Sequence, residues 1–240
     1  MPTLTDFDVL SLDCYGTLID WETGISSALA PWLKREGVQP DPKLILGAFA
    51  QHEAAQERET PSLLYPEVLA RVCRRLAEEL GISCHDEDAR AFGASVRDWP
   101  AFPDSGPALC YLQHHYKLVV LSNVDNGSFS HSRRKLGVRL DAVFTAEDIG
   151  SYKPDPSNFE HMLRELKRLG FGKSRILHTA QSLFHDLVPA TRLGLATTWI
   201  DRRHAQEGWG ATVPPDRAPR IDFRFESMEA FAEAHRREQL

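Results

Sequence analysis

The sequence predicts an α/β fold in which helices cover both faces of a parallel sheet and a block of helices is inserted near its start. From about residue 98 onward, short apolar runs of strand length alternate with segments of helical periodicity. Residues 21–97 show only helical patterns, and they follow directly after the first strand-like run. We therefore expect a core formed by residues 1–20 and 98–240, interrupted by an all-helical cap of residues 21–97.

The first predicted strand, residues 9–12, is a mostly apolar run that is followed by Asp13 and a turn at Gly16. Continuous apolar runs of this length are typical of strands that are buried on both faces. Asp13 then lies at the carboxyl end of the strand, which is the edge where open α/β sheets bind their ligands. Asp13 is accordingly a candidate nucleophile, and the alternative is that it only caps the turn.

The cap follows in order. Its segments have apolar residues at helical spacing, and glycines such as Gly37 and Gly81 stand where helices commonly end. Pro100 and Pro103 then favour an extended return to the core, because proline interrupts helical hydrogen bonding. The predicted cap helices are residues 21–36, 43–58, 62–80 and 85–97.

Strands and helices alternate through the rest of the chain, which is the pattern of a parallel sheet with crossover helices. A segment rich in glycine, proline and charge, residues 202–220, is predicted to be an irregular loop before an edge strand at 222–225 and a final helix. The preceding strands are predicted at 117–121, 142–145, 176–179 and 196–200, and the helices at 106–115, 127–136, 158–169 and 186–193.

Composition excludes several classes of partner. The chain has 240 residues and a net charge of −6, so it offers no basic surface for nucleic acid or for an anionic membrane. Its four cysteines have no CxxC spacing, which is typical of a reduced protein. No secretion signal and no apolar stretch of membrane-spanning length is found, so we expect a cytoplasmic protein that acts on a small molecule.

Polar side chains follow four of the predicted strands. The carboxyl ends of parallel strands meet at one edge, so these groups are expected to share a crevice. Together they supply a carboxylate, a hydroxyl and amide pair, an ammonium and a second carboxylate. They are Asp13 and Thr17 after the first strand, Ser122 and Asn123 after the second, Lys153 after the third, and Gln181, Ser182, His185 and Asp186 after the fourth.

With these four motifs in order and a helical insert after the first, the chain resembles the haloacid dehalogenase (HAD) superfamily over essentially its whole length. The resemblance implies a Rossmann-like core with a helical cap. Magnesium phosphatases of this superfamily carry an aspartate where this chain has Tyr15, and an acidic residue where it has Gln181. Mg²⁺ requires hard, charged oxygen ligands, so we expect neither a metal nor another cofactor. The pattern is similar to the metal-independent type II branch, the 2-haloacid dehalogenases and their relatives.

That resemblance implies nucleophilic catalysis, in which Asp13 displaces a substituent to form an ester that water then hydrolyses. Lys153 would keep Asp13 ionised, and the alternative is a surface lysine before a turn. Asp186 would activate water or hold Lys153, or would only cap a helix. We expect the substrate to be bound by Tyr15, Thr17, Trp21, Ser122, Asn123, Ser182 and His185. For the strand-end residues the alternative is capping, for Trp21 it is packing at a hinge, and His185 is also a candidate base.

The leaving group is less well determined than the nucleophile. The cap arginine of the dehalogenases is missing from residues 48–53, where the nearest arginine is Arg58, and Phe159 replaces a tyrosine of the family. A small 2-substituted carboxylic acid, with an (S)-2-haloacid first, is the predicted substrate. The first-motif segment and residues 178–186 also resemble the ring-opening azetidine-2-carboxylate hydrolases. A magnesium phosphatase and a non-catalytic ligand-binding protein are two further hypotheses, and a homodimer is compatible with the sequence.

Overall fold

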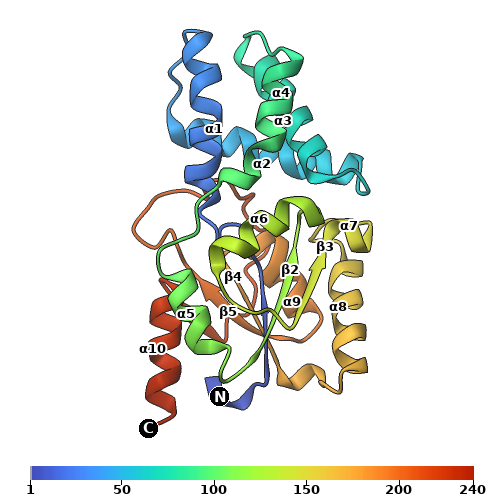
Figure 1. The fold of residues 1–240 in the computed structure, drawn as a ribbon, viewed down its shortest axis with the longest axis vertical. Helices are drawn as coiled ribbons and strands as arrows, with labels where there is room; N and C mark the ends of the chain where they lie inside the picture. The colour runs from blue at the N-terminus through green and yellow to red at the C-terminus, as the bar shows by residue number, and fades with distance from the viewer. Residues whose placement is uncertain (1) are drawn as a thin grey trace.

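The computed structural model describes residues 2–240 and has the predicted α/β architecture (Figure 1). Over these residues, six strands form one sheet in the order β3-β2-β1-β4-β5-β6, and every pairing is parallel. The central strand β1 therefore has β2 and β4 as neighbours, so the ends of three motif-bearing strands lie side by side. The strands are β1 (Val9–Leu12), β2 (Lys117–Ser122), β3 (Ala142–Thr145), β4 (Ile176–Ala180), β5 (Ala196–Ile200) and β6 (Phe223–Phe225).

Helices cover both faces of the sheet, as expected for crossover connections. Successive residues of a strand point to opposite faces, and Val9 and Leu10 accordingly belong to different apolar clusters. Leu10 packs in the cluster that contains Phe129 and Phe231, whereas Val9 packs in the one that contains Phe159. The helices of the first face are α5 (Ser105–Leu112), α6 (Asn126–Leu136) and α10 (Met228–Glu238), and those of the second are α8 (Pro156–Arg168) and α9 (Val188–Arg192).

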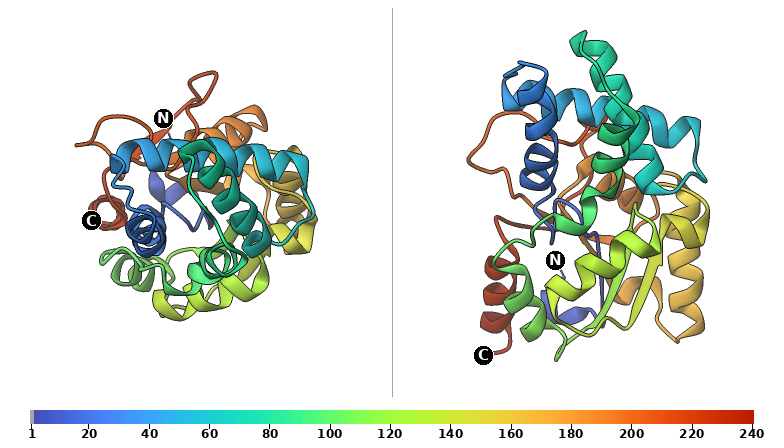
Figure 2. Two further views of the ribbon diagram at one scale, coloured as in Figure 1. Left: turned by 90° about the horizontal axis from the view of Figure 1, so that it is seen from above. Right: turned by 45° about the horizontal axis from the view of Figure 1, so that its top comes forward.

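The inserted helices stand together over the carboxyl ends of the strands, because α1 starts soon after β1 ends (Figures 1 and 2). Helix α3 shows why they form a unit. Its apolar residues recur on one buried face, and it ends at Gly81, whose φ of +65° suits a helix terminus. The cap helices are α1 (Trp21–Arg35), α2 (Pro42–Glu59), α3 (Tyr65–Leu80) and α4 (Asp86–Gly93), followed by a 3₁₀ turn at Ala94–Asp98.

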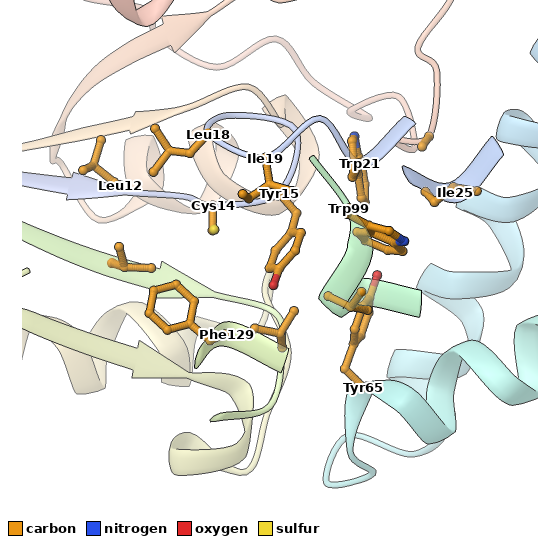
Figure 3. Close-up of a cluster of buried hydrophobic side chains, with 14 of the residues drawn as sticks. Leu12, Cys14, Tyr15, Leu18, Ile19, Trp21, Ile25, Tyr65, Trp99 and Phe129 are labelled. Carbon is orange, nitrogen blue, oxygen red and sulfur yellow. The ribbon is translucent and has the colours of Figure 1, made fainter. Parts of the chain in front are cut away.

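Aromatic packing joins the cap to the loop after β1 (Figure 3). Trp99, which is fully buried, lies 5.7 Å from the Tyr15 ring and 6.4 Å from the Tyr65 ring, centroid to centroid, in edge-to-face contacts. Helix α1 approaches so closely that a Cβ added to Gly24 would lie 2.3 Å from the Trp99 ring. The boundaries expected between core and cap, at residues 20 and 98, fall on either side of this aromatic junction. The division of the chain at these residues stays a prediction.

The structure corrects several predicted element boundaries. The helix expected at 186–193 begins earlier, as a π-helical turn at Leu183–Leu187 that continues into α9, because the Ser182 hydroxyl accepts a hydrogen bond from the backbone N–H of His185. The helix expected at 85–97 divides into α4 and the 3₁₀ turn. A short helix, α7 (Ala146–Ile149), was not predicted, since four residues are too few for a periodic signal. None of the helices in residues 2–240 has the length and apolar character needed to cross a bilayer.

Candidate active site

Lys153 links the two carboxylates that follow β1 and β4. Its Nζ donates hydrogen bonds to Asp13 Oδ1 at 2.9 Å, to Asp186 Oδ1 at 2.7 Å and to the backbone carbonyl of Leu121 at 2.9 Å. Lys153 and Asp186 are each 1% exposed and Asp13 is 6% exposed. Three segments of the chain therefore bring a buried ammonium between two buried carboxylates at the carboxyl ends of the strands.

Burial and charge oppose each other in this trio. Burial alone would lower the pKa of Lys153, but Asp13 and Asp186 outweigh it, so this pKa lies above its usual value. Burial raises the pKa of Asp13 in spite of the ammonium and Thr17. Burial also acts to raise the pKa of Asp186, but Lys153 and His178 outweigh it and hold that pKa below its usual value. The lysine is therefore charged, and Asp13 is protonated before Asp186 as the pH falls.

The loop after β1 holds the second oxygen of Asp13. Thr17 Oγ1 donates to Asp13 Oδ2 at 2.6 Å and accepts a hydrogen bond from the backbone N–H of Gln181 at 2.9 Å. The turn requires Gly16, whose φ is +87° and where an added Cβ would lie 2.9 Å from Gln181 Oε1 and 3.0 Å from Trp21 Nε1. Both oxygens of Asp13 thus have a donor, and the loop is tied to the end of β4.

His178 is a site residue that the sequence analysis did not identify. It lies within β4, fully buried, with Nε2 3.0 Å from Asp186 Oδ1 and Nδ1 2.9 Å from Ser11 Oγ. Phe159, at the position noted for a family tyrosine, packs edge-on against its ring at 4.9 Å. A histidine inside an apolar strand needs polar partners. The position of His178 in an apolar run was therefore the sequence signal for a buried polar contact. His178 and Lys153 together orient Asp186.

Ser122 and Asn123 have different surroundings. Asn123 Oδ1 accepts from the backbone N–H of Lys153 at 2.7 Å, and its Nδ2 donates to the Lys153 carbonyl at 3.0 Å. The same Nδ2 lies 3.3 Å from both carboxylate oxygens of Glu57 in the cap. The Ser122 hydroxyl is buried and has no hydrogen-bond partner within residues 2–240. Asn123 therefore fixes the backbone of Lys153 and contacts α2.

His185 is held by Ser182 as a neutral ring. The Ser182 hydroxyl oxygen accepts from the backbone N–H of His185 at 3.0 Å and lies 3.2 Å from His185 Nδ1. Burial lowers the pKa of His185 to about 4, so the ring is uncharged near neutral pH. When the hydroxyl donates to Nδ1, the ring proton is on Nε2, which is buried and has no partner in the described chain. His185 then contributes an N–H donor.

A small cavity of about 30 Å³ connects these groups with the cap. Tyr15 lines the cavity with its ring, because its hydroxyl group is hydrogen-bonded to Ser132 Oγ at 2.8 Å. Trp21 also lines the cavity, and its ring packs against that of Phe49. Thr17 and Ser122 lie buried outside the lining. An outer cavity of about 330 Å³ shares Glu57, Lys153 and His185 with the small one. The small cavity is lined by Asp13, Tyr15, Trp21, Glu53, Glu57, Tyr65, Asn123, Lys153, Ser182, His185 and Asp186.

Two carboxyl groups of the cap, Glu53 and Glu57, face this cavity and were also missed. They lie four residues apart on α2 and so share one helix face, and they are 3% and 4% exposed. Tyr65 donates its hydroxyl to Glu53 Oε1 at 2.5 Å, so both glutamates have neutral partners. Burial raises the pKa of Glu53 to about 8, and burial together with Glu53 raises the pKa of Glu57 well above its ordinary range.

The donor set does not fit a magnesium site. Within residues 2–240, no three histidine, cysteine, aspartate or glutamate side chains are placed to hold one ion. Lys153 occupies the space between Asp13 and Asp186, and the Tyr15 hydroxyl is engaged with Ser132. A divalent cation there would face an ammonium. At the two positions where the superfamily's phosphatases have acidic ligands, this chain has the phenol of Tyr15 and the amide of Gln181.

A parallel sheet with a buried carboxylate and ammonium at its carboxyl ends, under a helical cap, defines the class of capped α/β hydrolases. The chain belongs to the haloacid dehalogenase-like hydrolase family, whose family model matches residues 7–179. It is an enzyme of this hydrolase superfamily, and the fold class predicted from the sequence is confirmed.

One curated protein is similar in sequence, and several solved structures share the fold. The chain is 25% identical over 166 residues to a 6-phosphogluconate phosphatase of Escherichia coli (strain K12), covering 68% of this chain and 70% of that protein. An L-2-haloacid dehalogenase crystal structure superposes with a TM-score of 0.76 at 20% identity, over 96% of this chain and 99% of the other. The L-2-haloacid dehalogenase from Xanthobacter autotrophicus gives 0.75 at 15% identity, over 96% and 98%.

Proposed function

We propose that this enzyme hydrolyses a small 2-substituted carboxylic acid without a metal, through an ester formed on Asp13. The observation that carries the proposal is the placement of Lys153 Nζ between Asp13 and Asp186 in the cavity under the cap. An ammonium held by two carboxylates supplies the positive charge that would otherwise come from a metal ion.

In the first step, a carboxylate oxygen of Asp13 attacks carbon 2 of the substrate, and the substituent leaves with the electron pair of the broken bond. Thr17 and Lys153 orient the carboxylate for this attack. In the second step, water attacks the carbonyl carbon of the Asp13 ester. Asp186 serves as the base, because its Oδ2 is buried without a partner in the described chain and its pKa is low enough to keep it ionised.

The remaining predicted residues take binding and positioning roles in this proposal. Tyr15, Trp21 and Ser182 line the cavity, and the His185 Nε2–H is suited to a substrate carboxylate oxygen. Asn123 also lines it while holding the backbone of Lys153. Thr17 and the buried Ser122 hydroxyl lie behind the lining and act through Asp13 and the end of β2.

Two substrate classes fit this chemistry. An (S)-2-haloacid is the first candidate, supported by the names of the dehalogenases that share the fold. A ring amine such as azetidine-2-carboxylate is the second, supported by the cap segment 48–53, which contains Glu53 and no arginine to hold a halide.

Phosphatase activity and a purely ligand-binding role have less support. A phosphatase relative is known at 25% identity, but Asp13 and Asp186 line the cavity and would repel a phosphate dianion in the absence of a metal. A non-catalytic binding protein would not need a nucleophile with both oxygens oriented. A cytoplasmic location remains part of the proposal, resting on the sparse cysteine pattern.

The test is turnover of (S)-2-chloropropionate and azetidine-2-carboxylate in the presence of EDTA, with the 2-hydroxy acid product measured by chromatography. We expect one of them to be hydrolysed, and Asp13→Asn to abolish the activity. Asp98→Asn, an exposed change of the same kind, is the matched control and should retain it. Activity on an aryl phosphate that depends on added Mg²⁺, with no turnover of either acid, would support a phosphatase instead.

A further inference from the structure

We propose that Glu53 and Glu57 of α2 form the leaving-group site and that the group they receive is a protonated amine. The substrate is then a small amino acid whose 2-nitrogen belongs to a strained ring. This inference rests on the proposed ester chemistry at Asp13, and it chooses between the leaving groups that the proposed function allows.

The two glutamates and the nucleophile line one cavity from different parts of the fold. Both line the same small cavity as Asp13, but they come from the cap, whereas Asp13 belongs to the core. Attack from behind requires the leaving group to depart on the side away from Asp13, and we assign the cap glutamates to that side. The partners of Glu53 and Glu57 are the neutral side chains of Tyr65 and Asn123, so both carboxyl groups remain able to bind a cation.

The charge of the cavity favours a cation over an anion. Four carboxyl groups line it, those of Asp13, Asp186, Glu53 and Glu57, against the single ammonium of Lys153. Lys153 already donates to Asp13, Asp186 and the Leu121 carbonyl, so within residues 2–240 the cap glutamates have only Tyr65 and Asn123 as hydrogen-bond partners and no cation. A protonated nitrogen favours the carboxylate form of the glutamates and makes charge-assisted hydrogen bonds with it, which a halide cannot do.

Unpartnered polar atoms in the same cavity point to a ligand independently of the glutamates. His185 and Asp186 are 7% and 1% exposed, and both line the cavity. His185 Nε2 and Asp186 Oδ2 have no hydrogen-bond partner within residues 2–240. A buried polar atom without a partner is costly, so a polar ligand is expected to complete both. The N–H of His185 suits the carboxylate of a ligand, and the two glutamates suit its ammonium group. A zwitterionic amino acid carries both groups.

The step balances with the groups present. A carboxylate oxygen of Asp13 forms the bond to carbon 2, and the carbon–nitrogen bond breaks with its electron pair going to nitrogen, which becomes a neutral amine. The amine takes a proton from the glutamate pair and is held as an ammonium. When water hydrolyses the ester, one proton of the water goes to the 2-hydroxy group of the product. The other proton passes to solvent or back to the glutamate pair. Burial, which raises the pKa of Glu53 to about 8, keeps a proton available near neutral pH.

The first test measures binding without chemistry, in the Asp13→Asn background. Calorimetry would compare L-azetidine-2-carboxylate with cyclobutanecarboxylate, which has the same ring without the nitrogen. We expect the amine to bind at least ~10-fold more tightly, and Glu53→Gln or Glu57→Gln to remove most of that preference, as loss of a charge-assisted hydrogen bond predicts. Glu59→Gln on the same helix is the matched control, because Glu59 is exposed and paired with Arg75. Equal affinities, or a preference that survives both cavity variants, would overturn the inference.

The second test separates this inference from the proposed function. The variants are assayed in the enzyme that keeps Asp13, with azetidine-2-carboxylate and (S)-2-chloropropionate in parallel. Loss of ring opening in Glu53→Gln and Glu57→Gln, with melting temperatures no lower than that of the unmodified protein, supports the site. Chloropropionate hydrolysis with no ring opening by the unmodified enzyme rejects the amine but keeps the Asp13 chemistry. A retained amine preference in the binding test with no turnover of either substrate rejects the Asp13 chemistry but keeps the cation site.

Discussion

Lys153 Nζ lies 2.9 Å from Asp13 Oδ1, although the two residues are 140 positions apart in the chain. The contact exists because β1 and the segment after β3 end at the same edge of the sheet, and it is closed to solvent by the cap. The ammonium also bonds Asp186, so one positive charge serves the proposed nucleophile and the proposed base together. The chemistry assigned to this enzyme depends on that shared charge.

Lys153→Met is expected to lower kcat by at least ~100-fold, the magnitude typical of losing one electrostatic stabiliser. Without the ammonium, the carboxylates of Asp13 and Asp186 face each other in a buried site, so the pKa of Asp13 rises further. Any residual activity should therefore have its acid limb at higher pH. Steady-state kinetics over a pH series measures both effects, with Lys117→Met, an exposed position, as the control. Retention of more than about a tenth of the activity would contradict the role of Lys153.

Gly16→Ala is expected to destabilise the protein by about 1–3 kcal/mol and to reduce activity. Gly16 has a φ of +87°, and a Cβ there would lie 2.9 Å from Gln181 Oε1 and 3.0 Å from Trp21 Nε1. Gly150→Ala is the matched control, since its φ of +78° imposes similar backbone strain with no atom within 4 Å of the added Cβ. Denaturant unfolding should show the larger loss for Gly16→Ala. Equal losses would mean that backbone strain alone accounts for the effect.

His185 is expected to stay neutral down to about pH 5, because burial lowers its pKa to about 4. The unfolded chain protonates this ring near its ordinary pKa of 6.5, so folding stability attributed to His185 is complete above that value and is lost as the pH falls through about 4. NMR of labelled imidazole should show one neutral tautomer between pH 5.5 and 8. A titration of this ring near pH 6.5 would refute its assignment as a neutral donor.

Glu53 should make the protein less stable as the pH rises. Its pKa is raised to about 8 from an ordinary value of 4.5, so between these values the folded state keeps a proton that the unfolded chain has released. The stabilisation is complete below pH 4.5 and is lost as the pH passes through about 8. Glu53→Gln removes this dependence, so its melting temperature should exceed that of the unmodified protein by more at pH 8.5 than at pH 5.5. Glu59→Gln should show no such trend.

The core of the site was accessible from sequence because each motif is short and follows a recognisable strand. Asp13 ends a mostly apolar run of strand length, and Lys153 comes shortly after another strand, so the parallel arrangement brings them to one edge. Strand positions were predicted to within one or two residues for the same reason. The alternation of elements, together with the missing strands in residues 21–97, was enough for the fold class.

Glu53, Glu57 and His178 were missed because their importance depends on contacts between distant segments. On α2, the glutamates read as the polar side of a helix, and only the placement of the cap over β1 buries them. His178 reads as one residue of an apolar strand, and its partner Asp186 belongs to a π-helical turn that helical periodicity does not reveal. The direction of the Tyr15 hydroxyl, toward Ser132, likewise depends on where α6 packs.

The central claim, an ester on Asp13, is tested most directly by mass spectrometry of the protein after several turnovers in ¹⁸O-water with EDTA present. Hydrolysis of the ester at the aspartyl carbonyl places heavy oxygen in the carboxylate, so we predict label in the peptide that contains Asp13 and in no other peptide of the protein. The substrate that produces the label, chloropropionate or azetidine-2-carboxylate, also identifies the leaving group. Turnover that places ¹⁸O only in the hydroxy acid product, with an unlabelled Asp13 peptide throughout, would contradict the account, because water would then have attacked the substrate directly.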